Sequence, residues 1–460
     1  MSEKGTAQAQ PKRLTAALKY GFGVGDFGFV LMSNIETFYF NSFLTGAGFT
    51  PAIAAAINSV FSIVDACLSW IYGGILNATK AKKWGRYRSW MILTPWIVPF
   101  LFAFQFLRLG SNEILSAVII VVAAIVSHIV WNIGYVANAT LVAVYGKTPE
   151  DKATLASSRA TWNRIGGLAF SYLGLPFATW LGGIIGEKNQ WAAAAFLLGI
   201  LMVVGYWAHF AMGKGYEDPE PEGTVNNYKK INVQEMFVSL FQNPQLILLL
   251  LADLAKWCVN FVTAASAIYY FRDAVGNPGL MAGYLLCTNI AAIIGSYVAR
   301  YLCQKLSNRT TMIIAEFGMA IALVVAYFAY ATYTAVIGCM AVAMFFYGVA
   351  FAAAPALYTD TIVYATYKTG KEASGWIMGL QNLPLKIAVF LRGVILNACL
   401  VAVGWVSGEV LQGTARQGMM LPLALIPGIF CVVGGILMIC FRLTKDRVAQ
   451  SQKELDARRA

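Results

Sequence analysis

The segment YGFGVGDFGFVLMSNIETFYFNSFL, residues 20–44, indicates the class of this protein. It is long and apolar enough to cross a bilayer as an α-helix, which needs about 20 residues for a hydrocarbon core of roughly 30 Å. Yet it contains two acids, Asp26 and Glu36. An ionisable side chain at that depth costs on the order of 2.5–3.5 kcal/mol and persists where it faces a water-filled cavity or pairs with another group. A spanning segment of this kind is typical of a solute transporter.

Similar apolar stretches recur along the rest of the chain. Hydrophobic residues make up 58% of the sequence and charged residues 12%, whereas soluble domains carry about 25% charged residues. The pattern predicts an all-α membrane protein with twelve transmembrane helices in two pseudo-symmetric six-helix bundles, the major facilitator architecture. The predicted spans are 20–44, 52–78, 89–108, 114–145, 157–185, 191–212, 243–271, 279–304, 310–331, 334–364, 373–404 and 420–441.

Basic residues are distributed unevenly among the loops. The chain has 34 Lys and Arg and a formal net charge of +12, and most of these residues lie near the termini and the loops that follow even-numbered spans. The loops on the other side hold Arg108, Lys188, Arg272 and Arg416. The positive-inside rule therefore predicts a multi-pass protein of the inner membrane with both termini cytoplasmic. Because topology accounts for the basic charge, we expect no nucleic-acid partner.

Sequence signals for other classes of protein are missing. No cleavable signal peptide is visible before the first span. The eight cysteines lie singly, without a CxxC motif or a Cys/His cluster, so no metal site or disulfide framework is indicated. A lone histidine such as His128 is more often a core residue than a proton relay. Without a nucleophile–base pair or a set of metal ligands, we expect no enzyme activity and no cofactor, and we expect a monomer in the lipid bilayer.

The longest polar stretch divides the chain into two halves. GKGYEDPEPEGTVNNYKKINVQE (213–235) is rich in Pro, Gly and charged residues and is typical of a linker. We predict an N-terminal six-helix bundle over 1–212, a cytoplasmic linker over 213–235, a C-terminal six-helix bundle over 236–445 and a cytoplasmic tail over 446–460.

Short basic loops support the division into two repeats. The loops at 81–90 and 303–311 fall at equivalent positions in the two halves, as parallel repeats require. Segments rich in Gly and Ala at 182–183, 292–295 and 348–354 permit close contacts between helices. Rocking of two bundles depends on such contacts.

Six motifs together carry a family resemblance. They are KYGFGVGDFGFVLM (19–32), FSIVDACLSWIYGGILNATKAKKWGRYRSW (61–90), NIGYVANATL (132–141), DKATLASSR (151–159), AIYYF (267–271) and TDTIVYATYKTGKEASGW (359–376). In this order, and over nearly the whole chain, they resemble the glycoside–pentoside–hexuronide:cation symporters, the melibiose permease-like family of the major facilitator superfamily. The resemblance implies secondary active transport of a glycoside, sugar or sugar acid such as a hexuronide, by cation symport with alternating access.

The resemblance also implies which residues bind the substrate. Asp26 matches an acid that accepts hydrogen bonds from sugar hydroxyls, Arg159 an arginine facing the same cavity, and Lys386 a lysine of that cavity. The alternatives are a structural ion pair for Asp26 and a snorkelling side chain for Arg159. Asn132 stands where melibiose permease has an acid and Val136 where it has an aromatic ring, which argues against an α-galactoside site.

Lys256 makes the expected cavity richer in cations. Together with Arg159, Lys386 and Arg392, it favours an anionic substrate such as a hexuronide or another sugar acid. However, Lys256 lies three residues after Asp253, and residues at this spacing share a helix face. An internal ion pair between the two is therefore the alternative.

The expected cation site departs from the family pattern. Asp65 matches the first acid of that site, but Leu68 replaces a polar ligand and Ser69 the second acid. Two carboxylates one turn apart suit sodium, which takes hard oxygen ligands, whereas a single desolvated carboxylate can titrate near neutral pH. We predict proton coupling through Asp65, ahead of uncoupled diffusion and sodium coupling. Glu36 either supplies a further protonatable group or lies toward the outer interface.

Charged residues at the cytoplasmic ends of the spans are predicted to form gating ion pairs between the bundles. They are Arg86, Asp360, Lys368 and Lys371. Two other functions stay open at this point. One is a non-transporting membrane sensor, although the short linker and tails leave little room for a signalling domain. The other is a carrier of a different organic anion or amphipathic acid.

Overall fold

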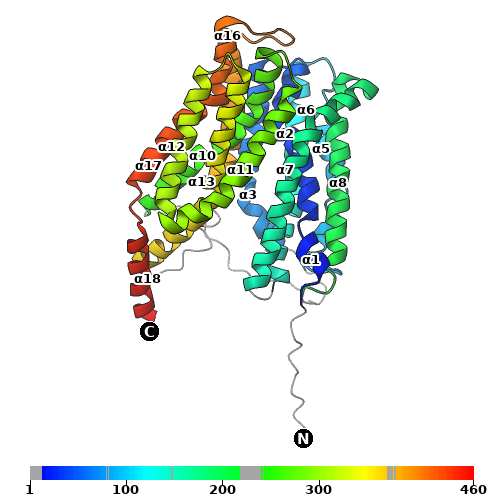
Figure 1. Ribbon diagram of the computed structural model, residues 1–460. Helices are drawn as coiled ribbons and strands as arrows, with labels where there is room; N and C mark the ends of the chain where they lie inside the picture. Colours follow the sequence, from blue (N-terminus) through cyan, green and yellow to red (C-terminus); the bar gives the residue numbers. More distant parts are fainter. Residues whose placement is uncertain are drawn as a thin grey trace.

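The computed structural model describes residues 13–78, 80, 82–146, 149–217, 240–241, 243–369, 377 and 380–459. Within these ranges every regular element is a helix, and the long helices stand side by side (Figure 1). The predicted all-α architecture is confirmed.

The first half of the chain forms one group of helices in Figure 1. Its elements are α1 (Ala16–Gly21), α2 (Val24–Gly46), α3 (Pro51–Ala78), α4 (Trp90–Leu93), α5 (Val98–Phe104), α6 (Glu113–Tyr145), α7 (Pro149–Ile185), the short η1 (Glu187–Asn189) and α8 (Gln190–Met212). The predicted third span is not one continuous helix but the pair α4 and α5. Pro95 lies between these two helices and Pro99 near the start of α5, and proline inside a helix removes a backbone hydrogen bond and clashes with the preceding turn.

The second half forms the other group. Its elements are α10 (Pro244–Tyr269), the π-helical turn η2 (Tyr270–Ala274), α11 (Leu280–Lys305), α12 (Asn308–Phe328), α13 (Tyr333–Thr369), α15 (Leu383–Ala402), α16 (Gly413–Gly418), the π-helical turn η3 (Leu421–Leu425), α17 (Ile426–Cys440) and α18 (Lys445–Arg459). The region predicted as a tail over 446–460 is thus mostly the helix α18. The linker prediction, 213–235, falls outside the described residues after Glu217.

Ten of the described helical segments are long and apolar enough to cross a membrane. The two further predicted spans correspond to α2, which carries Asp26 and Glu36, and to the interrupted pair α4 and α5. The helices α7 and α13 each contain 37 residues, or about 55 Å at 1.5 Å per residue. They are therefore longer than the hydrocarbon core is thick.

Close contact between α11 and α13 depends on two glycines. A Cβ on Gly295 would lie 1.9 Å from the carbonyl oxygen of Phe345, and one on Gly348 would lie 2.0 Å from that of Ala292. No side chain fits at these distances, so the backbones of the two helices touch directly. These glycines belong to the small-residue segments that the sequence singles out.

A cluster of amide side chains joins the two groups of helices. Asn41 of α2 donates to the Tyr269 hydroxyl of α10 (2.8 Å), and Asn397 of α15 donates to Asn41 Oδ1 (2.8 Å). Asn58 of α3 donates to the same oxygen (3.1 Å). All four side chains are buried. This asparagine cluster lies near the C-terminal end of α2, and thus away from the end of the molecule that carries α1 and α18 (Figure 1).

Candidate functional site

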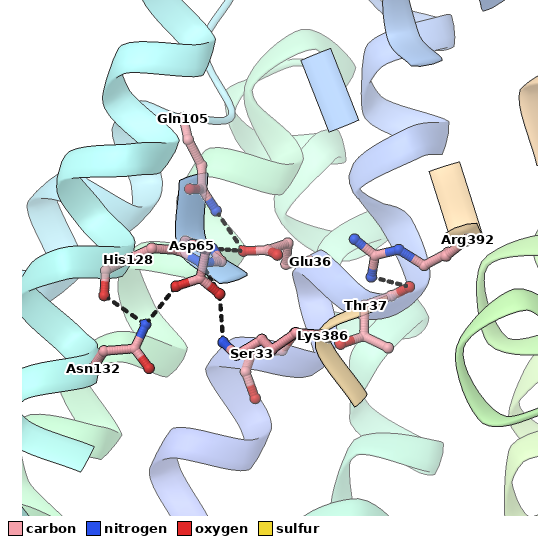
Figure 2. Close-up of polar contacts among 9 residues, drawn as sticks. All are labelled: Ser33, Glu36, Thr37, Asp65, Gln105, His128, Asn132, Lys386 and Arg392. Carbon is pink, nitrogen blue, oxygen red and sulfur yellow. Dashed lines mark hydrogen bonds and ion pairs between the residues drawn. The ribbon is translucent and has the colours of Figure 1, made fainter. Parts of the chain in front are cut away.

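A buried polar network lies where α2, α3, α6 and α15 meet (Figure 2). Its central members are Glu36, Asp65, Gln105, His128, Asn132 and Lys386. Buried polar groups are costly unless they are hydrogen-bonded and buried charges are costly unless they are paired. The concentration of such groups marks this network as the first candidate for function.

Asp65 is held by nitrogen donors from both halves of the chain. Its Oδ2 pairs with the Lys386 ammonium of α15, and its Oδ1 accepts a hydrogen bond from Asn132 Nδ2 of α6 at 2.9 Å. The Asp65 side chain is 7% exposed and that of Lys386 14%. The ion pair therefore connects α3 of the first group to α15 of the second inside the protein.

His128 lies between the two carboxylates of the network. Its Nε2 is 2.9 Å from Glu36 Oε2, and its Nδ1 is 3.6 Å from Asp65 Oδ2. Gln105 donates a second hydrogen bond to the same Glu36 oxygen, at 3.1 Å. The imidazole can thus carry a proton between two acids that come from different helices.

Glu36 is buried, at 9% exposure. Arg392 is also buried, at 3% exposure, and donates to the Thr37 carbonyl oxygen at 3.4 Å (Figure 2). Its guanidinium lies close enough to attract Glu36 electrostatically. The network thus includes Glu36, for which the sequence allows either a role as a further protonatable group or a position toward the outer interface.

A second polar cluster lies between α2, α6 and α7. Arg159 Nε is 3.0 Å from both carboxylate oxygens of Asp26, and Asn138 Nδ2 donates to Asp26 Oδ2 at 2.9 Å. The guanidinium carbon of Arg159 lies 4.7 Å from the centre of the Tyr135 ring. The acid and the arginine that the resemblance assigns to the substrate are therefore in direct contact.

The third cluster lies inside the second group of helices. Lys256 Nζ is 2.5 Å from Asp253 Oδ1 on the same face of α10, and Lys256 is 2% exposed. Trp257 Nε1 and the Tyr358 hydroxyl donate to Asp253 Oδ2 at 3.2 and 3.3 Å. Lys256 is thus neutralised by the acid three residues before it, and it does not join Arg159 or Lys386.

The predicted gating residues are only partly described. Asp360 accepts a hydrogen bond from Asn308 at 3.3 Å, within the second group of helices. Arg86 is buried, and Lys368 is exposed on α13. Lys371 and the side chain of Ser69 lie outside the described residues. An inter-bundle gate of these residues stays a prediction.

The sequence missed two members of the network. His128 lies four residues before Asn132, so both side chains project from one face of α6. This spacing could have indicated that His128 belongs to the same site as Asn132. Gln105 follows the broken helix α5, and nothing in its local sequence indicates a buried partner. Within the described residues, no group of three or more His, Cys, Asp and Glu side chains could hold a metal ion.

Comparison with known proteins identifies the family. A family profile described as "MFS/sugar transport protein" matches residues 21–445, nearly the whole chain. The chain belongs to this family. The suspected resemblance and the predicted major facilitator fold are therefore confirmed, and the family consists of membrane transporters rather than enzymes.

Individual relatives are distant but cover the full length. The isoprimeverose transporter of Lactiplantibacillus pentosus is 20% identical over 93% of this chain and 88% of its own. The glucuronide carrier protein homolog of Escherichia coli K12 is 20% identical over 95% of both chains. Among solved structures, the nucleoside transporter NupG has the same fold, with a TM-score of 0.64 at 11% identity over 93% of this chain and 100% of its own. Sugar transport across a membrane is the activity common to the family description and these two sequence relatives.

Proposed function

We propose that this protein is a proton-coupled symporter for a sugar or sugar acid that works by alternating access. The observation that carries the proposal is the ion pair between Asp65 and Lys386. It links the two bundles within the buried polar network that also contains His128. The Asp26–Arg159 cluster supplies acceptors and donors suited to sugar hydroxyls.

The donors around Asp65 favour a proton over sodium. A hard cation such as sodium is bound by several oxygen ligands, whereas three of the described groups beside Asp65 present nitrogen: the ammonium of Lys386, the amide of Asn132 and the imidazole of His128. The Tyr72 hydroxyl is a described oxygen neighbour. A resident ammonium already occupies the place beside the carboxylate. A proton needs no ligand shell and can be passed on by an imidazole.

Protonation of Asp65 would loosen the link between the bundles. Neutral Asp65 no longer attracts Lys386 as a charge, so α15 is free to move relative to α3. The asparagine cluster, by contrast, is uncharged and holds the opposite end of the bundles together. In the predicted orientation, with both termini in the cytoplasm, the asparagine cluster closes the outer side, and release of the Asp65–Lys386 pair removes one contact between the bundles.

The substrate class rests on the relatives and on Asp26. One relative is described as an isoprimeverose transporter and another as a glucuronide carrier homolog, so both neutral sugars and hexuronides are reasonable substrates. The Asp26 carboxylate offers two strong acceptor oxygens for adjacent sugar hydroxyls. Since Lys256 is neutralised by Asp253, an acidic sugar would need a different cation for recognition.

Transport by purified protein in proteoliposomes tests the proposal. Uptake should follow an inward proton gradient, collapse with a protonophore and show no stimulation by a sodium gradient. Asp65→Asn should lose accumulation against a gradient and retain counterflow, because a permanently neutral side chain resembles the protonated acid. Sodium-driven accumulation by the unmodified protein would refute proton coupling at Asp65, and absence of any sugar counterflow would refute the function itself.

A further inference from the structure

Arg164 differs from the other cations inside the helix bundles. Arg159, Lys256 and Lys386 each form an ion pair with a carboxylate, and Arg392 is 97% buried and bonded to a backbone carbonyl. Arg164, on α7, is only half-buried and has no carboxylate within ion-pair distance among the described residues. An unpaired arginine at membrane depth is costly, and such residues mark substrate pathways.

The surroundings of Arg164 come from the opposite bundle. Its Nη2 donates to the Ser296 hydroxyl of α11 at 3.3 Å, and its guanidinium carbon lies 5.2 Å from the centre of the Phe351 ring of α13. Phe351 is 39% exposed although it lies well inside a 37-residue helix. The Arg164 side chain of α7 therefore lies at the contact between the two bundles.

The stacking fixes how the guanidinium can bind a ligand. An arginine over an aromatic ring keeps the N–H edges of its planar fork free for hydrogen bonds in its own plane. Apart from Nη2, its N–H groups bond to no described residue and are not among the buried atoms that lack a partner, so the protein does not enclose them. A carboxylate or sulfonate matches this fork with two parallel hydrogen bonds.

Local charge reinforces this preference. Lys256 Nζ lies 5.5 Å from the centre of the same Phe351 ring, but its charge is balanced by Asp253. Arg164 is therefore the cation of this group that has no carboxylate partner among the described residues. An anion bound beside it would supply the missing negative charge.

We propose that Arg164 is the anion-recognition residue of the transport site and binds the carboxylate or sulfonate of an acidic sugar. The inference rests on the proposed sugar transport and adds the substrate class and the residue that selects it. Ser296 and Phe351 position the guanidinium. Neither Lys256 nor Lys386 is needed for recognition of the negative charge, because each already has its own acid.

Matched sugars separate charge recognition from sugar recognition. Binding of methyl β-D-glucuronide, methyl sulfoquinovoside and neutral methyl β-D-glucoside to the full-length protein in nanodiscs is measured by calorimetry, and the same three sugars are tested in counterflow. The unmodified protein should prefer the two acids by about 10- to 100-fold, the range of hydrogen bonds to a charged group. Arg164→Gln should remove this preference by weakening binding of the two acids far more than binding of the glucoside, and Arg164→Lys should keep part of it because the charge stays and the fork is lost.

Arg416→Gln is the matched control, since Arg416 bonds to the Ala331 carbonyl oxygen and interacts with Tyr270, near the far end of the second bundle. This variant should keep the preference for acids. Equal binding of acids and glucoside by the unmodified protein, or an undiminished preference in Arg164→Gln, would overturn the inference while sugar transport stands. If the unmodified protein moves none of the three sugars nor any other sugar in counterflow, the proposed function itself fails.

Discussion

Replacement of His128 by glutamine is the most direct probe of the proton pathway. The substitution keeps a hydrogen-bond donor near Glu36 but removes the imidazole, which can accept a proton on one ring nitrogen and release one from the other. Nε2 of His128 lies 2.9 Å from Glu36, and Nδ1 lies 3.6 Å from Asp65. No other described side chain forms a hydrogen bond or ion pair with both acids.

The cost to stability can be bounded from the contacts that remain. Removal of one partner from a buried ion pair costs roughly 3–5 kcal/mol, but Glu36 keeps its hydrogen bond from Gln105 and the nearby charge of Arg392. We therefore expect a loss of about 2 kcal/mol, at the level of one charge-assisted hydrogen bond. A chain of this length should show this as a decrease of only about 4 °C in melting temperature.

Counterflow measured between about pH 5 and pH 8 gives the decisive result. The unmodified protein should show a clear dependence on pH, and His128→Gln should flatten that dependence while the folded protein still binds sugar. His209→Gln is the matched control, because His209 is equally buried but packs against the rings of Phe22 and Tyr145 without a hydrogen bond. An unchanged pH profile in His128→Gln would show that the proton does not pass through this imidazole.

Four further substitutions test other parts of the structure. Asp26→Asn and Arg159→Gln should each weaken sugar binding by roughly 30-fold or more, as for loss of one partner of a buried charge pair, and unchanged affinity in calorimetry would assign that residue a structural role. Asn397→Leu should weaken the asparagine cluster and increase the labelling of cysteines introduced on the side of the bundles that this cluster closes. Labelling equal to that of cysteines in the otherwise unmodified protein would exclude the cluster as a closing contact. Gly348→Leu should prevent α11 and α13 from touching and abolish folded protein in size-exclusion chromatography, whereas a folded variant would show that the helices can separate at this point.

The fold could be predicted from the sequence because a bilayer imposes a simple rule on it. Each crossing needs about 20 apolar residues with all backbone groups bonded internally, so helices are recognisable from composition alone. The exception was the third span, where prolines break the helix into α4 and α5. Apolar composition indicates a crossing but does not say whether the helix is continuous.

The candidate site could be predicted only in part. The pair of Asp253 and Lys256 follows from a spacing of three on one helix, and the contact of Asp26 with Arg159 follows from the family resemblance. The ion pair of Asp65 with Lys386 joins residues 321 positions apart. Its two partners lie on helices whose contact is fixed by tertiary packing, which no local pattern encodes.

Glu36 shows the same limit more clearly. Its helix carries other polar residues, among them Ser33 and Thr37, so the local sequence does not say which face is turned to the protein. The answer depends on α6, which supplies His128 from 92 positions away, and on Gln105 from 69 positions away. Likewise, the local sequence does not show that Arg164 contacts the other bundle, because that contact depends on α11 and α13.

The distribution of charges suggests why a proton and an acidic sugar would travel together. When Asp65 is ionised, its charge and that of Lys386 cancel inside the protein, and this balance is needed because an uncompensated buried charge is strongly destabilising. A proton on Asp65 leaves Lys386 unbalanced, whereas an oxyanion at Arg164 adds one negative charge to the same space between the bundles. The two events together therefore leave the net charge between the bundles unchanged. Uptake of the proton alone would add an uncompensated positive charge in a region of low dielectric constant, so we expect protonation of Asp65 to be favoured when the acidic sugar is bound.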